Sequence, residues 1–154
     1  MNDLLRHTVA TVAYRGGKAL RAAPPEFAAF RLDPASRTPL EIVAHIGDLF
    51  DWALSLANGR QRWHDSAPLP WDQEVSRFFA TLDAFDARLA EADPLGAPAE
   101  RLFQGPIADA LTHIGQLAML RRIAGSRITG ENYYVAGIAA GRVGPDQPQP
   151  EKEF

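Results

Sequence analysis

The segment from residue 71 to residue 89 constrains the fold of this chain more than any other part. Its apolar residues recur at alternating intervals of four and three, the spacing at which a helix meets its neighbours in a bundle. The residues in this pattern are Trp71, Val75, Phe78, Leu82, Phe85 and Leu89. The segment is therefore predicted to be a long helix that packs along its whole length.

A second helix has the clearest start signal. Thr38 is predicted as its N-cap, Pro39 as its first helical residue, and Glu41 as the partner of Thr38 in a capping box. A single apolar stripe follows, and Gly59 is predicted to stop the helix. The stripe consists of Ile42, Ile46, Leu49, Ala53 and Leu56.

The first helix is predicted from about Leu4 to Ala22, and Gly16 and Gly17 interrupt it. Each of these glycines costs about 1 kcal/mol relative to alanine in the middle of a helix. Either the close crossing of another element or a local bend would explain that cost.

The last long helix is predicted to open at Gly105-Pro106 and to stop at Gly125. A short helix is expected over residues 132–140, followed by a proline-rich tail. These elements predict an all-α protein, an up-down four-helix bundle with a short C-terminal helix and an extended tail. Residues 1–154 would form one domain, with the bundle and short helix in 1–141 and the tail in 142–154.

Composition excludes several classes of function. The 154 residues include 46% hydrophobic residues and carry a net charge of -3, with no basic stripe, which argues against a nucleic-acid partner. The chain has no cysteine, so a metal ion would have to be held by His, Asp or Glu. No run approaches the ~20 apolar residues of a membrane helix, and no secretory signal is evident, so we expect a cytoplasmic protein without a membrane partner.

Three residues suggest a metal site. Asp109 and His113 are four positions apart, so they share one face of a helix and can hold the same ion. His45, which borders the apolar stripe of its own helix, would be the third ligand. Three protein ligands with an open position are typical of a catalytic metal site. Alternatively, each histidine is an ordinary hydrogen-bonded core residue, and Asp109 is a carboxylate favoured by the helix dipole.

Residues beside these ligands are candidates for supporting roles. Asp48 could orient the imidazole of His45, or it could be an exposed helix charge. Gln116 could contact a metal-bound water or a substrate, or it could make an interhelical hydrogen bond. Gly115 either opens space at the site or only eases packing. His7 and His64 are expected to be surface histidines.

The motif THIGQLAMLRRIAG closely resembles the last-helix motif of the DinB-like superfamily, often written H-x-x-x-H-R-G-Q. His45, followed by Ile46 and Asp48, resembles the first metal ligand of that family. The resemblance covers most of the chain. It implies a three-ligand site for a divalent metal, most often zinc or nickel, thiol-transfer or hydrolytic chemistry, and a homodimer.

Two positions depart from the family pattern. Asp109 stands where the family usually has a histidine, and Ile114 stands where it has an arginine. The mycothiol-dependent maleylpyruvate isomerases, which are similar bundles, carry a carboxylate at the position of Asp109 and bind a functional zinc ion. The sequence thus predicts a metal-dependent enzyme that acts on an unknown small molecule. The alternative is a helical module, with or without metal, that acts through self-association or a protein partner.

Overall fold

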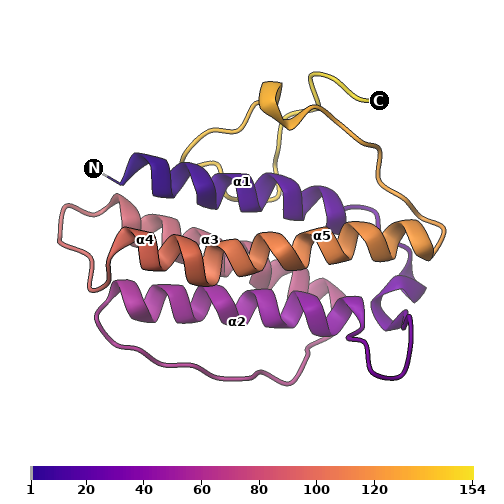
Figure 1. Ribbon diagram of the computed structural model, residues 1–154, viewed down its shortest axis with the longest axis horizontal. Helices are drawn as coiled ribbons and strands as arrows, with labels where there is room; N and C mark the ends of the chain where they lie inside the picture. The colour runs from indigo at the N-terminus through magenta and orange to yellow at the C-terminus, as the bar shows by residue number, and fades with distance from the viewer. Residues whose placement is uncertain (1) are drawn as a thin grey trace.

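The computed structural model describes residues 2–154 and consists of four long helices packed side by side (Figure 1). The fourth is one continuous helical stretch made of three consecutive segments. No β-strand occurs within residues 2–154, which confirms the all-α bundle. The helices are α1 (Asp3–Leu20), α2 (Pro39–Ala57), α3 (Trp71–Ala90), and α4 (Ala99–Leu102) continued by η2 (Phe103–Ile107) and α5 (Ala108–Ile123), with a short 3₁₀ helix η1 (Pro25–Ala29) between α1 and α2.

Helices α2 and α3 run in the same direction. Near the start of α3, the guanidinium of Arg77 donates to the carbonyl of Ala44 at 2.7 Å. Near its end, Arg88 donates to the carbonyl of Ala57, the last residue of α2, at 3.2 Å. The order of directions is therefore up, down, down, up, and the prediction of simple alternation is corrected at this connection.

The parallel arrangement requires the chain to return along the bundle between α2 and α3. Residues 58–70, here called the crossover segment, run in an extended path beside α2 (Figure 1). Side chains of α2 hold this segment: Ser55 accepts from the backbone N–H of Arg62 at 3.1 Å, and Asp48 accepts from that of Ser66 at 2.9 Å. The segment is thus fastened to the helix that carries His45.

The local signals of α2 act as predicted. Thr38 accepts a hydrogen bond from the N–H of Glu41 at 3.2 Å, and Glu41 accepts one from the N–H of Thr38 at 2.7 Å, which completes the capping box. Gly59 follows the helix with a φ of +69°, a conformation that ordinary side chains rarely adopt. Gly125 ends α5 in the same way, with a φ of +83°.

The core lies between the four helices. Phe78, Leu82, Phe85 and Leu89 of the predicted seam are all buried. A Cβ atom on Gly16 of α1 would lie only 2.5 Å from Cζ of Phe78, so α1 crosses α3 too closely for any side chain there. The close-crossing explanation of Gly16 is confirmed.

The fourth helix begins earlier than predicted. Helical backbone starts at Ala99, and Pro106 lies inside it instead of at its first position. Proline lacks an N–H and its ring crowds the preceding turn; the π-type turn η2 accommodates both by widening the backbone. Asp109 consequently lies in the interior of a longer helix, so the dipole at a free helix end does not account for its position.

The C-terminal region is held against α1 of the same chain. The helix predicted over 132–140 is present only as a 3₁₀ turn, η3 (Tyr133–Val135). The side chain of Glu131 accepts hydrogen bonds from Tyr14 at 2.8 Å and Lys18 at 2.7 Å, both on α1. Val143 is buried, and the tail passes over α1 (Figure 1). The tail is therefore held by contacts within its own chain, and its order does not require a second copy.

Candidate metal centre

The structure brings His45, Asp109 and His113 together between α2 and α5. Nε2 of His45 lies 3.6 Å from Oδ2 of Asp109, and Nε2 of His113 lies 3.5 Å from Oδ1 of the same carboxylate. The two imidazole rings are 4.8 Å apart, centre to centre, and nearly perpendicular. One donor atom from each residue lies within 4.8 Å of both others, so the group could hold a metal ion.

These separations suit first-row divalent metals. Ligand atoms held at about 2.1 Å in tetrahedral coordination stand about 3.4 Å from one another. The two nitrogen–oxygen distances of 3.5 and 3.6 Å are close to that value. Two imidazoles and one carboxylate are also a donor set that zinc and nickel accept. The residues present therefore match the predicted cofactor in donor type and in approximate spacing.

The surroundings of His45 favour its neutral form. Its side chain is 17% exposed, and burial lowers its pKa below the ordinary value, helped by the positive charge of Arg37 and by His113. Asp109 opposes this shift but does not overcome it. A neutral imidazole offers a free nitrogen lone pair, which is the form that binds a metal.

Gln116 supports the site through His113. Its amide oxygen lies 2.7 Å from Nδ1 of His113, one turn earlier on α5. An amide oxygen only accepts, so Nδ1 carries the proton and Nε2 is left free toward Asp109. Of the two alternatives for Gln116, the interhelical hydrogen bond is not the contact found, because its partner His113 lies on the same helix.

Trp63 packs against the ring of His45, and Trp52 packs against Trp63. The ring of Trp63, carried by the crossover segment, meets the His45 ring edge to face at 5.7 Å. Trp63 also meets Trp52 at 5.8 Å, and Trp52 lies two turns after His45 on α2. The crossover segment thus places the indole ring of Trp63 against a candidate metal ligand. Sequence reasoning missed this role because nothing local to Trp63 indicates which helix it will cover.

Asp48 makes no hydrogen bond or ion pair with His45 within residues 2–154. It is buried, so the exposed-charge alternative is wrong, and its carboxylate accepts hydrogen bonds from Ser66 and from Arg77 at 3.0 Å. The expectation that it orients the His45 imidazole has no supporting hydrogen bond within residues 2–154. Its role in the structure is to fasten the crossover segment and α3 to α2.

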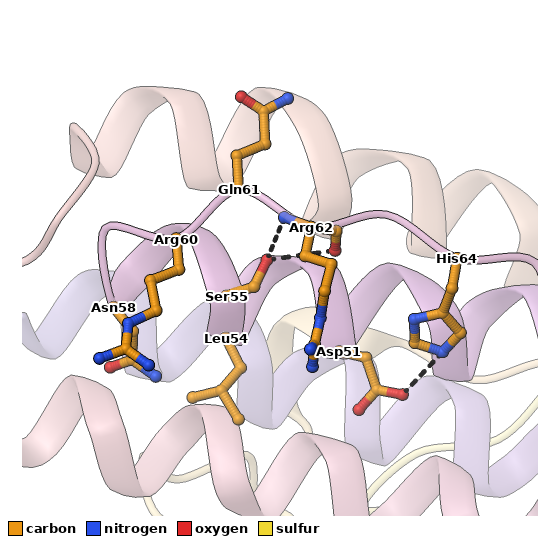
Figure 2. A pocket seen from close by; sticks show the side chains of 8 residues that line it. All are labelled: Asp51, Leu54, Ser55, Asn58, Arg60, Gln61, Arg62 and His64. Carbon is orange, nitrogen blue, oxygen red and sulfur yellow. Dashed lines mark hydrogen bonds and ion pairs between the residues drawn. The ribbon is translucent and has the colours of Figure 1, made fainter.

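A second group of potential ligands lies beside Asp48. Nε2 of His64 is 3.4 Å from Asp48 and 3.5 Å from Asp51, and these three residues also could hold a metal ion. Arg77, however, already donates to both carboxylates, at 3.0 and 3.2 Å, and offsets part of their charge. His64 is exposed, as expected, but it joins this network through the crossover segment (Figure 2).

Several hollows lie on the surface of the described residues 2–154. One of about 890 Å³ lies between the end of α2 and the crossover segment, is lined mainly by polar side chains, and does not include the three ligand candidates (Figure 2). A hollow of about 560 Å³ is lined by His113 and Gln116, and one of about 390 Å³ by His45. Arg37 lines both of the smaller hollows, which therefore adjoin the candidate metal centre.

Gly115 opens the hollow beside His113. A Cβ atom on this glycine would meet no atom within 4 Å, so the missing side chain does not serve close packing. Of the two explanations considered for Gly115, the structure supports open space at the site.

Comparison with family models, with curated proteins and with solved structures finds no match to this chain. Its function is therefore inferred from the residues of the site.

Proposed function

We propose that this protein is a divalent-metal-dependent enzyme of the DinB-like superfamily that carries out thiol-transfer or hydrolytic chemistry on a small molecule. The observation that carries the proposal is the convergence of His45, Asp109 and His113 from two helices beside an open hollow. Zinc and nickel are the metals that the donor set favours.

A bound divalent ion would polarise a carbonyl or thiol, or lower the pKa of a coordinated water toward ~7. The chain's own residues prepare that chemistry. Burial keeps His45 neutral at physiological pH, and Gln116 fixes the proton of His113 on Nδ1. Asp109, 48% exposed, supplies one negative charge on the solvent side. Only three protein donors are gathered, which leaves a coordination position for water or substrate.

An enzyme needs room for a substrate next to its metal. The hollow at His113, of about 560 Å³, falls within the range of ~300–1,000 Å³ typical of small-molecule sites. A module that acts only as a binding surface has no need of open space next to half-buried imidazoles. This is why the enzyme is preferred over the helical module.

The second candidate function, self-association, is favoured by one observation. Large apolar side chains on the same face are exposed, including Met119 at 57% and Ile123 at 48%. As the alternative to an open small-molecule site, we propose a homodimer in which a second copy would cover part of this surface. Light scattering at micromolar concentration should give twice the monomer mass, and a monomer mass alone would reject the dimer without affecting the metal site.

The enzyme proposal is tested on protein purified without an affinity tag, because a tag can scavenge metal. Elemental analysis should find about one zinc or nickel per chain, and anomalous diffraction should place it between α2 and α5. The loaded protein should then catalyse thiol transfer to, or hydrolysis of, members of a small-molecule panel, and chelation should stop the reaction. Absence of metal after incubation with zinc and nickel would overturn the proposal.

A further inference from the structure

We propose that the hollow beside His113 binds a small organic anion with an apolar body, whose acidic group pairs with Arg37. This inference rests on the proposed function, since it names the class of substrate for the same site. It is argued from the charge, the lining and the size of the hollow.

Arg37 stands where the two hollows next to the metal centre meet. It lines the hollow of about 560 Å³ together with His113 and the hollow of about 390 Å³ together with His45. An anion bound by Arg37 would consequently lie in hollows that His113 and His45 also line. A substrate held there would have its acidic end fixed beside the candidate metal ligands.

Arg37 is exposed, and its guanidinium has no protein partner within residues 2–154. No hydrogen bond or ion pair joins its side chain to any part of residues 2–154, although the segment before α2 is well supplied with polar groups. Arg31, which lines the same smaller hollow, is by contrast bonded to the carbonyl of Ser36 and lies 3.5 Å from Glu41. The N–H groups of the Arg37 guanidinium are therefore available to a ligand. A guanidinium can donate two parallel hydrogen bonds to the two oxygens of a carboxylate.

The lining of the larger of the two hollows is apolar and lacks acidic residues. Its neutral polar side chains are Ser36, Thr112 and Gln116, and no aspartate or glutamate contributes to it. The absence of a carboxylate from this lining favours an anionic ligand here, whereas the smaller hollow that Arg37 also lines includes Glu41, Asp48 and Asp65. The apolar wall is formed by Leu32, Ile42, Met119, Leu120 and Ile123.

Three of these wall residues are unusually exposed for their size. Leu32 is 55% exposed, Met119 57% and Ile123 48%. An apolar body lying against them would remove that surface from water, at about 25 cal/mol for each Å² buried. A second copy of the chain could bury the same wall, but it would also have to bury the unpaired charge of Arg37, which is costly without a partner. A small anion with an apolar body would cover the exposed apolar side chains and pair with the charge of Arg37.

The test uses octanoate as the probe, octanol as its uncharged analogue, and isothermal titration calorimetry on the metal-free protein. Wild type should bind octanoate more tightly than octanol. Arg37→Gln should weaken octanoate binding about 2- to 5-fold, because the pair with this exposed guanidinium is lost, and should leave octanol binding unchanged. Arg60→Gln is the matched control: it removes the same charge from an exposed arginine at the distant polar hollow, and octanoate binding should stay at the wild-type level.

A second variant tests the position of the apolar body. Gly115→Leu places a side chain into the open space of the hollow without a clash at its Cβ, so it should weaken both octanoate and octanol. Equal octanoate affinity in wild type and Arg37→Gln, or unchanged binding in Gly115→Leu, would overturn the inference. A third outcome would also overturn it: sedimentation shows a wild-type dimer that Gly115→Leu dissociates, and calorimetry shows no octanoate binding. A second copy of the chain would then be the occupant of the hollow.

The proposal of a metal site and the proposal of an anionic substrate can be rejected independently. Because the titrations use metal-free protein, a chain that takes up no metal can still bind octanoate through Arg37. A chain that binds zinc but discriminates poorly between octanoate and octanol would retain the metal centre and lose only the anionic substrate class.

Discussion

The amide oxygen of Gln116 lies 2.7 Å from Nδ1 of His113, and this contact selects the nitrogen that His113 presents to a metal. The proton stays on Nδ1, and Nε2 points toward Asp109, 3.5 Å away. Partners of this kind, which hold a ligand histidine in one tautomer, contribute strongly to the affinity of metal sites.

Gln116→Leu should weaken zinc binding about 10- to 100-fold, because the imidazole loses the acceptor that fixes its tautomer. Gln116→Glu should retain wild-type affinity, since a carboxylate accepts the same hydrogen bond. Gln116 is exposed, so neither variant should disturb the core. Calorimetry with zinc measures all three proteins, and equal affinity in wild type and Gln116→Leu would show that the contact does not support the site.

His113→Ala should abolish zinc and nickel binding, because it removes one of three ligands and one arm of the i,i+4 pair with Asp109. His7→Ala is the control, since His7 is an exposed histidine that contributes to neither group of potential ligands. Calorimetry should give wild-type affinity for the control. The same affinity for His113→Ala would contradict the assigned ligands.

Asp109→His should tighten binding of zinc and nickel, because imidazole suits these metals better than carboxylate does. The substitution keeps the i,i+4 geometry and changes only the donor. Competition against a chromophoric chelator gives the affinity of each protein. Weaker binding by the variant would mean that the negative charge of Asp109 matters more than donor type.

Acid should weaken metal binding below about pH 6, because protons and metal compete for the imidazole nitrogens. The metal-free fold should respond in the same direction. Burial lowers the pKa of His45 below its unfolded value of about 6.5. Between the folded and the unfolded pKa, the unfolded chain therefore binds more protons than the folded chain. The resulting stability is present above about pH 6.5 and is lost as the pH falls through the folded pKa. Urea unfolding at pH 7.5 and pH 5.5 should show this loss, and it should be smaller in His45→Gln.

Two helical glycines should respond oppositely to alanine. Gly16→Ala should lower the free energy of unfolding by about 1–3 kcal/mol, because its Cβ would lie 2.5 Å from Phe78 and 3.1 Å from Ile114. Gly115→Ala should raise it by up to about 1 kcal/mol, since nothing lies near its Cβ and alanine favours the helix. Urea denaturation measures both, and a stabilising Gly16→Ala would contradict the close crossing.

Glu131→Gln should loosen the C-terminal region from α1. The carboxylate is fully buried and holds both Tyr14 and Lys18, so the loss of its charge should cost about 1–3 kcal/mol. Hydrogen exchange of residues 142–154 should become faster. Glu151→Gln, at an exposed position of the tail, is the control and should leave both stability and exchange unchanged.

The sequence by itself determined the features that depend on near neighbours in the chain. The spacing from Trp71 to Leu89 predicted α3, and the capping box of Thr38 and Glu41 predicted the start of α2, because both act within a few turns of helix. The pairing of Asp109 with His113 followed from helix geometry in the same way. The early start of the fourth helix at Ala99 was missed because proline usually marks a helix start, and only packing decided that η2 would enclose Pro106.

The tertiary structure alone decided the direction of α3 and everything that follows from it. A connecting segment carries no local signal for whether it turns back or returns along the bundle, since that choice depends on which helix faces bury most surface together. Once α2 and α3 are parallel, the crossover segment must pass along α2, and it brings Trp63 against His45 and His64 beside Asp48. The meeting of His45 with Asp109 and His113 likewise depends on contact between α2 and α5, which residues more than sixty positions apart cannot specify through local propensity.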